Sequence, residues 1–557
     1  MAEEVSILAR RITKRSFLLA SSPRMLFCFA VVFLAGLLPR LHDFNRSLWT
    51  DESWVANSVL SDTLHRMFYY DGWLQTSPPL FLMLVRYTVK VFGLSNYTLR
   101  AVPFVFGIVA LLLFAELSCR IFEPPYALLS TAILAVSPVA IVESTELKQF
   151  SSDLAAAVLV LLVICNYWRR SGDRQWYWLL GSFAAALGLS YTTVIFIPLA
   201  LIALYKPRPH TSDSRQTRKT RRSRITTFVV MVLAISGMNY ILFIRPNSSP
   251  NLKLYWQLHF PPNSIFQTML FYVREVGGLF LFSVLPRHWL PDSDSPARWL
   301  SGVLSIAAIA IFGFAFGAIL RRPKYIYIGA LCVVPILILL VLNLMHIYPL
   351  HSRVLTLCVL PCVIIGLTLA IEAICHEFVS PFIPFRYRKP LLGTLSVLGL
   401  VFIFLHSIMP LRWLEYHQED AEGAILYLKS HVVPGDLVYV HASASETSRL
   451  YLRMLGWQPA GLTYGHTGYP CCTRNSQDYF VPDELQYRED FDNAILNAHP
   501  KRLWLVFTGR ESQWEYLHRD EPQILINRLS GVGCSGELTL AFTNEVVNEF
   551  NCNDGRI

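Results

Sequence analysis

Long apolar runs follow one another along most of the chain, separated by short polar segments that are often basic. A run of about 20 apolar residues crosses a bilayer as a helix, because a helix satisfies its own backbone hydrogen bonds in lipid. Only 16% of the 557 residues are charged and 53% are hydrophobic, whereas an average soluble domain carries about 25% charged residues. The sequence therefore predicts a polytopic α-helical membrane protein.

The basic residues cluster at the ends of the apolar runs, where membrane orientation explains them. The formal net charge of +9 therefore does not indicate a nucleic-acid partner. The first apolar run, 25–38, follows several arginines and lysines and has no cleavage site of small residues after it. We expect it to be a retained first helix with the N-terminus on the cytoplasmic side.

The second apolar run, residues 80–94, decides the topology. If it crossed the membrane, the basic loop 206–224 would lie outside, against the positive-inside bias. Because Arg86 and Lys90 interrupt it, we predict an amphipathic interfacial helix there instead, and an interfacial or re-entrant helix at 265–282. Eleven spans are then expected, at 25–38, 101–117, 126–142, 154–168, 176–190, 194–205, 227–244, 300–320, 326–345, 355–374 and 391–409.

From Leu411 the composition becomes that of a soluble domain. Two domains are predicted: a membrane domain over residues 1–410 and an extracytoplasmic α/β domain over 411–557. In the second, strands are expected at 436–441 and 502–507, helices at 446–455 and 513–529, and a hairpin at 538–550. Its four cysteines fit disulfides in an oxidising compartment, with the pairing left open: Cys471, Cys472, Cys534 and Cys552.

The stretch 39–54, PRLHDFNRSLWTDESW, begins where the first span ends. The neighbouring acids Asp51 and Glu52 fit a general base, a metal ligand or a solvated loop. Two further polar clusters, 143–153 and 346–353, fall on the same side of the membrane in the expected topology. Ionisable residues at such positions are costly, so this concentration favours a functional site, and ion pairs that hold helices together are the alternative.

Several motifs in these loops resemble those of the GT-C glycosyltransferases, in particular the family 39-like branch of protein O-mannosyltransferases and lipid A aminoarabinose transferases. The resemblance covers about the first 410 residues. It rests on Arg40 with the segment Ser47-Leu-Trp-Thr-Asp51-Glu52, on Ser77-Pro-Pro-Leu80 with Arg100, on Glu146-Leu-Lys148-Gln-Phe150, and on Tyr348-Pro349 with Arg353. Ser77 stands where the family often has histidine, and Lys148 and Phe150 stand where arginine and tyrosine are frequent.

The resemblance implies an inverting enzyme that moves a hexose or pentose from a polyprenyl-phosphate carrier to a protein, lipid or glycan acceptor. It implies a site on the extracytoplasmic face of a membrane, with the bacterial inner or plasma membrane favoured. Asp51 would be the base, assisted by Glu52. Lys148, Arg353 and Arg100 would bind the donor phosphate. The supporting residues would be Glu146, Tyr348, His351 and Arg40.

No cofactor is certain from the sequence. A divalent metal ion held by Asp51, Glu146 and His351 is one alternative, although their spacing is not diagnostic. Neutralisation of the phosphate by Arg353 and Lys148 without a metal is the other. A transporter or flippase of lipid-linked sugars is the alternative function, and it would be expected to show inverted repeats.

Overall fold

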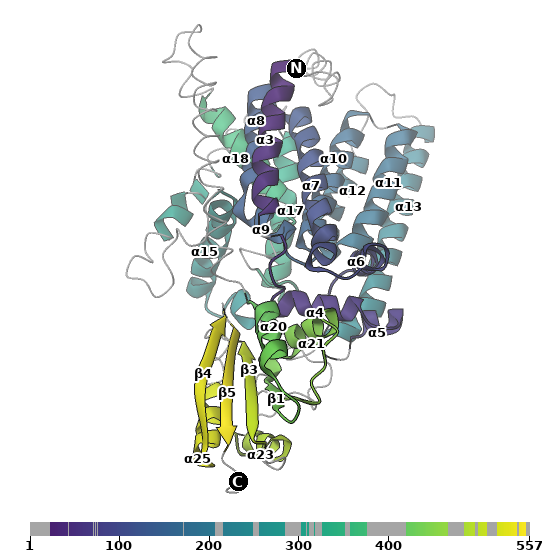
Figure 1. Ribbon diagram of the computed structural model, residues 1–557. Coiled ribbons are helices and arrows are strands. Elements are labelled where there is room, and N and C mark those ends of the chain that lie inside the picture. Colours follow the sequence, from purple (N-terminus) through teal and green to yellow (C-terminus); the bar gives the residue numbers. More distant parts are fainter. Residues whose placement is uncertain are drawn as a thin grey trace.

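In the computed structural model, the described residues up to 375 are mainly helical, and those from 419 onward include one small sheet (Figure 1). It describes residues 23–248 apart from 43, 71, 73, 75, 171 and 206–214, then 256–284, parts of 302–317, 326–350, 357–375, 419–465, 484–495, 500–508 and 521–552 apart from 543–544. The predicted span 391–409 and most of 300–320 lie outside the described residues, as do Cys471 and Cys472.

The helices of the bundle follow the apolar runs. They are α3 (Pro23–Leu41), α7 (Asn96–Ile121), α8 (Pro124–Val136), α9 (Pro138–Ser144), α10 (Phe150–Arg169), α11 (Asp173–Leu189), η1 (Tyr191–Phe196), α12 (Ile197–Tyr205), α13 (Arg215–Asn239), α15 (Ile265–Val284), α17 (Ile326–Leu344) and α18 (Leu360–Ile374). Their apolar side chains form one large buried cluster, in which α10 is the most enclosed helix.

Five of the described helices are long and apolar enough to cross a membrane, and the bent pair α8–α9 would make a sixth. The pair bends by 52° where Pro138 cannot supply a backbone N–H to continue the ladder. The predicted spans 194–205 and 355–374 fall on shorter apolar helices. Several apolar helices are thus established in the described part of the chain, whereas the expected count of eleven is not.

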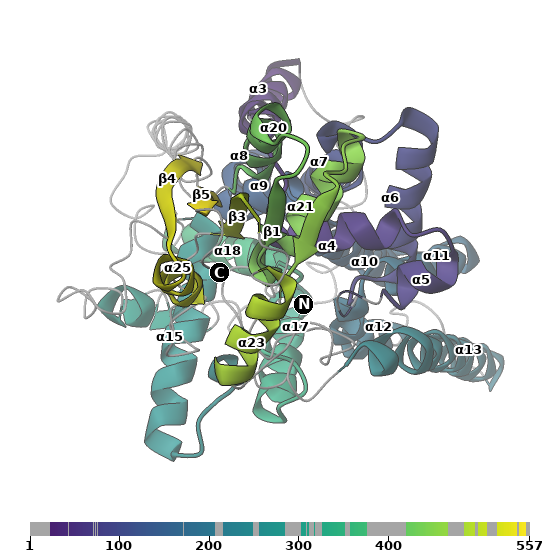
Figure 2. The same cartoon turned by 60° about the horizontal axis from the view of Figure 1, so that its bottom comes forward.

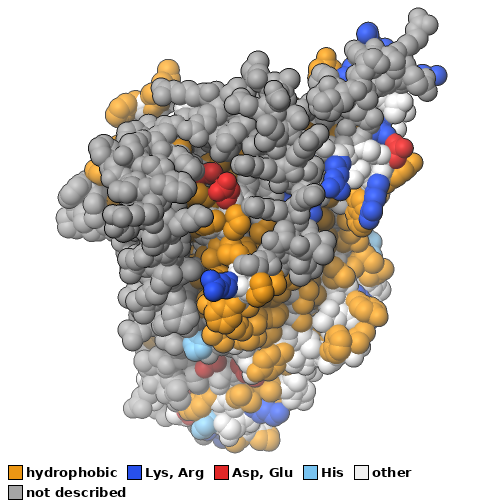
Figure 3. Space-filling view, turned by 90° about the horizontal axis from the view of Figure 1, so that it is seen from above, with side chains coloured by type: hydrophobic (Ala, Val, Ile, Leu, Met, Phe, Trp, Pro, Cys, Tyr) orange, Lys and Arg blue, Asp and Glu red, His pale blue; other side chains and the backbone are white. Residues whose placement is uncertain are grey.

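Among the described residues, several arginines lie at one end of the bundle, including Arg169 and Arg224 from the loops that motivated the predicted orientation. Arg120 binds Glu116 and Asn166 where α7 and α10 end, and Arg224 of α13 pairs with Asp173 at the start of α11. This is the end away from the sheet, and seen from there Lys and Arg side chains lie among hydrophobic ones (Figure 3). The bundle therefore has a basic end and an end that faces the sheet.

Three short helices lie between the bundle and the sheet: α4 (Thr50–Val59), α5 (Leu64–Phe68) and α6 (Pro79–Phe92). At 14 residues, α6 is only about 21 Å long and cannot cross a hydrocarbon core of about 30 Å. In Figure 1 it is seen nearly along its axis, across the direction of the bundle. Arg86, which interrupts the apolar run, donates to the carbonyls of Val59 and Ser61 at 2.8 and 2.6 Å, so it anchors α6 to the end of α4.

The helix α15 occupies the stretch predicted to be interfacial or re-entrant. It packs against α8, α9 and α18. Its first turns expose large apolar side chains, whereas Glu275 and Leu279 are buried. Its position relative to a membrane stays a prediction.

The C-terminal part forms a five-stranded sheet of order β2-β1-β3-β5-β4. The strands are β1 (Leu437–Val440), β2 (Gly461–Tyr464), β3 (Arg502–Thr508), β4 (Cys534–Phe542) and β5 (Glu545–Cys552), and the helices are α20 (Ala421–His431), α21 (Ser445–Met454), α23 (Glu484–Ala494) and α25 (Glu521–Gly531). Strand β1 lies parallel to β2 and β3, and β5 is antiparallel to β3 and β4. The expected strands, the helix at 446–455 and the hairpin are all present.

Alternate residues of the central strands serve two separate cores, as the two-residue period of a strand requires. Tyr439 and Leu505 face α23 and α25, whereas Val438 and Trp504 face α20 and α21. The second core continues without a break into α4, α6 and Leu147 of the bundle loops. Figures 1 and 2 show α21 beside α4. The sheet and the first loop therefore share one hydrophobic core.

The hairpin at the sheet edge is closed by a disulfide between Cys534 and Cys552, which are 18 residues apart. Replacing both by serine should lower the free energy of unfolding of this edge by about 2–4 kcal/mol, because the link restricts the unfolded chain. Hydrogen exchange of the β4 and β5 amides would measure the loss. Cys28→Ser, at a free cysteine of α3, is the control and should leave these amides unchanged; equal protection in both variants would contradict the prediction.

Candidate active site

Asp51 and Glu52 stand in the first turn of α4, and they have opposite environments. Successive residues on a helix point about 100° apart. The Glu52 side chain is therefore directed into the protein and is fully buried, whereas 33% of the Asp51 side chain is exposed. Acids near a helix N-terminus are stabilised by the helix dipole, so this turn is suited to carry both charges.

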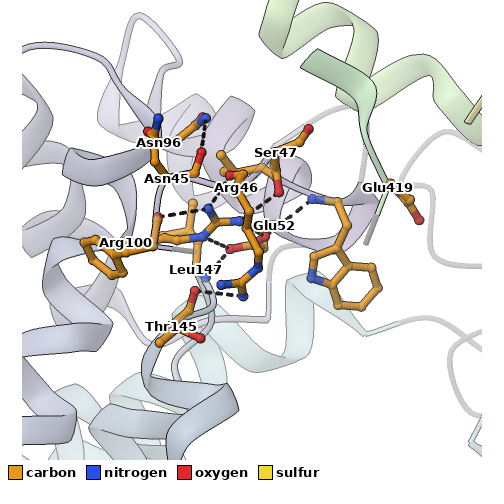
Figure 4. A network of polar contacts seen from close by, with 12 residues as sticks. Asn45, Arg46, Ser47, Glu52, Asn96, Arg100, Thr145, Leu147 and Glu419 are labelled. Carbon is orange, nitrogen blue, oxygen red and sulfur yellow. Dashed lines mark hydrogen bonds and ion pairs between the residues drawn. The ribbon is translucent and has the colours of Figure 1, made fainter. Parts of the chain in front are cut away.

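Glu52 forms a two-point ion pair with Arg100 of α7, and both side chains are 0% exposed. Nε and Nη2 of Arg100 lie 2.8 and 2.5 Å from the two carboxylate oxygens. The same guanidinium donates to the carbonyls of Phe44, Arg46 and Ser47 at 3.3, 2.5 and 3.0 Å (Figure 4). Arg100 thereby fixes the backbone that leads into α4.

Burial by itself opposes ionisation of Glu52, but the charge and hydrogen bonds of Arg100 outweigh it and hold the pKa of this carboxyl below its usual value. The Leu147 amide adds a hydrogen bond of 2.7 Å to Glu52 Oε1. Arg46 reaches the same second loop, donating to the carbonyl of Thr145 at 3.0 Å. Glu52 is thus an ionised group that joins the first and second loops.

Asp51 faces Lys148 of the second loop, with 3.4 Å between Oδ2 and Nζ. Lys148 retains 15% exposure, and its ammonium group lies 5.6 Å from the centre of the Trp54 ring. This ion pair is therefore open on one side, in contrast to Glu52–Arg100. An accessible carboxylate beside an accessible cation can meet an incoming hydroxyl group and an incoming phosphate.

The remaining parts of the second loop lie against the segment before α6. Ser77, which precedes the paired prolines, donates to Gln149 at 3.0 Å, and the Tyr191 hydroxyl lies 3.5 Å from the Ser77 carbonyl. Glu143 and Glu146 are buried. The structure therefore brings the first two predicted clusters together at one end of the bundle.

The third cluster is only partly described. Burial raises the pKa of the Tyr348 hydroxyl, and the Cys358 thiol and the Asp153 carboxyl add to the shift. Tyr348 is thus neutral. It lies close to Asp153, which is in the first turn of α10, the helix that begins shortly after Lys148. His351 and Arg353 lie outside the described residues.

Arg40 is buried at the end of α3, and its Nη1 donates to the carbonyls of Gly36 and Ala135 at 2.5 and 2.7 Å. Its described hydrogen bonds therefore join α3 to α8. They do not involve Asp51 or Lys148.

Over the described part of the chain, no three His, Cys, Asp or Glu side chains are grouped so that they could hold a metal ion. Asp51 pairs with Lys148 instead. His351, the third residue of the predicted metal set, lies outside the described residues, so the metal alternative stays a prediction.

The sequence did not indicate the contribution of the C-terminal part to this site. Glu419 accepts hydrogen bonds from both the amide and the hydroxyl of Thr50, each at 2.7 Å. Tyr451 accepts from the Leu48 amide at 2.6 Å and donates to Asn96 at 3.1 Å. The bonded residues are hundreds of positions apart, and a single glutamate or tyrosine in a soluble segment carries no local signal.

Comparison with known proteins bears on the family and the fold of the chain. Residues 76–238 match the family model of dolichyl-phosphate-mannose-protein mannosyltransferases. The matched segment contains Arg100 and Lys148 but ends short of the sheet. No curated protein matches the chain.

Two solved structures of ArnT from Cupriavidus metallidurans are similar over nearly the whole chain. The form bound to undecaprenyl phosphate has a TM-score of 0.54 at 14% identity and covers 95% of this chain and 98% of that one. The apo form has a TM-score of 0.50 at 15% identity, covering 94% and 97%. The resemblance inferred from the loop motifs is confirmed: the chain has the fold of the GT-C superfamily of membrane glycosyltransferases and resembles the branch of ArnT and the protein mannosyltransferases.

Proposed function

We propose that this protein is an inverting glycosyltransferase that moves a sugar from a polyprenyl-phosphate carrier to an acceptor at the extracytoplasmic face of a membrane. The observation that carries the proposal is the open Asp51–Lys148 pair at the end of the bundle that faces the sheet. The mannosyltransferase family match and the undecaprenyl phosphate bound by ArnT support the donor class. We include the division into a membrane domain over 1–410 and an α/β domain over 411–557 in this proposal.

Asp51 acts as the base. Its carboxylate takes the proton of the acceptor hydroxyl or amine as the acceptor oxygen or nitrogen attacks the anomeric carbon. The C–O bond to the carrier phosphate breaks on the opposite side of that carbon, so the configuration inverts and the polyprenyl phosphate leaves with the bonding electrons.

Lys148 stabilises the charge that develops on the departing phosphate. In the absence of donor its ammonium pairs with Asp51 at 3.4 Å. The phosphodiester of the donor carries one negative charge and competes for that ammonium, so donor binding weakens its hold on Asp51 and frees the carboxylate to meet the acceptor. We assign Arg353 the same phosphate-binding role from the motif.

Arg100 and Glu52 support the site from behind. Because Arg100 has no exposed side-chain surface and binds Glu52 and three carbonyls, its role in our proposal is to hold the loop rather than to touch the donor. Glu52 balances the charge of Arg100 and accepts a hydrogen bond from the Leu147 amide of the second loop.

The proposed membrane orientation follows from the two ends of the bundle. Arg120, Arg169 and Arg224 lie at the end away from the sheet, which the positive-inside bias assigns to the cytoplasm. Asp51 and the sheet then lie outside, where an acceptor protein, lipid or glycan of the cell envelope is available. A transporter would need its ionisable groups near the midplane, and Asp51 and Lys148 are instead at one end.

Asp51→Asn should lower the turnover number for sugar transfer by about 10²–10⁴-fold, because an amide cannot accept the acceptor proton. Transfer of radiolabelled sugar from polyprenyl-phosphate donors in purified membranes would measure it at matched expression. The control is Asp62→Asn in the same loop, whose carboxylate is 80% exposed beside Arg66 and should transfer normally. Full activity of Asp51→Asn would exclude Asp51 as the base.

Lys148→Gln should raise the KM for the lipid donor by roughly tenfold, because a charge-assisted contact to phosphate is lost. Lys148→Arg should restore much of the affinity. Lys90→Gln, at an exposed lysine of α6, is the control. A KM unchanged in Lys148→Gln would remove Lys148 from the phosphate site.

Glu52→Gln should destabilise the protein by about 3–5 kcal/mol, because it leaves the buried Arg100 without its counter-charge. Since the folded protein holds the pKa of Glu52 below its unfolded value, the contribution is full above the usual carboxyl pKa of about 4.3 and is lost as the pH falls through the folded value. Thermal unfolding in detergent from pH 7 to acid would measure both effects. Equal stability of wild type and variant at pH 7 would contradict the assigned role.

A further inference from the structure

The helix that carries Asp51 has no acceptor for its first amides at the usual position. An N-cap is normally Ser, Thr, Asp or Asn, whose oxygen accepts an amide hydrogen of the first turn. In α4 the N-cap residue is Trp49, and an indole nitrogen can only donate. The amide of Thr50, the first residue of the helix, is instead bound by another part of the chain.

Glu419 supplies an acceptor from 369 residues away. Its Oε2 accepts both the amide and the hydroxyl of Thr50, the first residue of α4, at 2.7 Å each. Glu419 has no exposed surface and stands directly before Asp420, the N-cap of α20, whose Oδ1 accepts the Gly423 amide at 3.0 Å. A fixed helix start in the C-terminal part thus caps a helix start in the first loop.

The amides just before Thr50 are bound as well. The Leu48 amide donates to the Tyr451 hydroxyl at 2.6 Å, and the Trp49 amide donates to Glu52 Oε2 at 3.4 Å. On the other edge of this segment, Arg100 binds three carbonyls. The approach to Asp51 is therefore held between α7 and the C-terminal part, as Figure 4 shows for Arg100, Glu52 and Glu419.

A second buried glutamate holds α4 farther along. Glu446 of α21 accepts from the Asn57 side-chain amide at 2.8 Å and from the Tyr70 hydroxyl at 2.8 Å. Burial raises the pKa of Glu446, and the hydrogen bonds from Asn57 and Tyr70 oppose the shift. Asn57 lies six positions after Asp51 along α4, so this contact docks the helix without touching its first turn.

We propose that Glu419 is a positioning residue for the transfer reaction: it caps α4 and so sets the direction of the Asp51 carboxylate. The proposal rests on the function proposed above. A carboxylate at a helix N-terminus bonds orphan amides and complements the helix dipole, and a misplacement of about 1 Å in a catalytic group costs about 10²-fold in rate. The C-terminal part thereby completes the site through Glu419, which acts on the position of the base rather than on a substrate.

The test uses the full-length protein and steady-state transfer from undecaprenyl-phosphate and dolichyl-phosphate sugars. Glu419→Ala should lower kcat by about 10- to 100-fold while the KM for the lipid donor stays unchanged, because Lys148 is not displaced. Glu419→Gln, whose amide oxygen can still accept both bonds, should recover most of the kcat. Glu446→Ala removes a buried carboxylate of the same part from the same helix and should lower stability without this loss of kcat.

Two further measurements separate positioning from general loss of structure. In the Asp51→Asn background, Glu419→Ala should cause no further loss, because Glu419 acts through Asp51. Hydrogen exchange of the amides of residues 48–53 should be faster in Glu419→Ala than in wild type, and unchanged in Glu446→Ala.

An unchanged kcat in Glu419→Ala, an equal further loss in the Asp51→Asn background, or unchanged exchange at residues 48–53 would each overturn the proposal. Absence of transfer by the wild type with every donor would overturn the proposed function instead. The exchange measurement would then decide by itself whether Glu419 caps α4.

Discussion

The buried ion pair between Glu52 and Arg100 is the interaction on which the rest of the site depends. Removing two charges from water costs several kcal/mol per ion, and a buried pair is tolerable only if its remaining hydrogen-bonding capacity is also satisfied. Here Arg100 donates to both carboxylate oxygens and to three carbonyls, and the Leu147 amide donates to the carboxylate. The hydrogen bonds that satisfy the two charges go to backbone groups of the first and second loops. The pair therefore also fixes the backbone of these two loops.

That constraint separates the roles of two neighbouring acids. Because consecutive helical residues diverge by about 100°, fixing Glu52 inward directs Asp51 toward the opening, where it meets Lys148. A base must exchange its proton with a substrate, whereas a buried counter-ion must keep its charge. In the proposed reaction these two requirements fall on two carboxylates, Asp51 and Glu52, at adjacent positions of one helical turn.

Much of the arrangement was predictable because its causes are local. Charged residues within the run 80–94 predicted a helix that does not span, and the structure shows Arg86 tied to the end of α4. Of the three loop clusters predicted to share a face, the first two do meet, through Asp51 and Lys148. The alternation of residues 436–441 predicted a strand there, and the alternate residues of β1 do serve separate cores.

The parts that were not predictable depend on contacts between distant residues. A run of apolar residues does not reveal that Pro138 bends a helix by 52°, so hydropathy alone gives a poor count of spans. Arg100 matched a motif residue that we expected to bind the donor phosphate. Only the fold shows that its guanidinium is paired with Glu52. No sequence pattern marks Glu419 or Tyr451, because their partners in the first loop come close only when the C-terminal part packs against that loop.

The shared core of the first loop and the sheet explains why that docking is firm enough to matter for chemistry. Apolar residues of α4, α6, α20 and α21 form one cluster with the sheet, so the C-terminal part cannot move away without exposing hydrophobic surface. The hydrogen bonds that Thr50 donates to Glu419 then form between surfaces that the shared core already holds in place. Such bonds can orient the first turn of α4. The start of α4 is held by Arg100 on one side and by Glu419 on the other. In the proposed reaction, this is how the bundle and the C-terminal part together set the direction of the base.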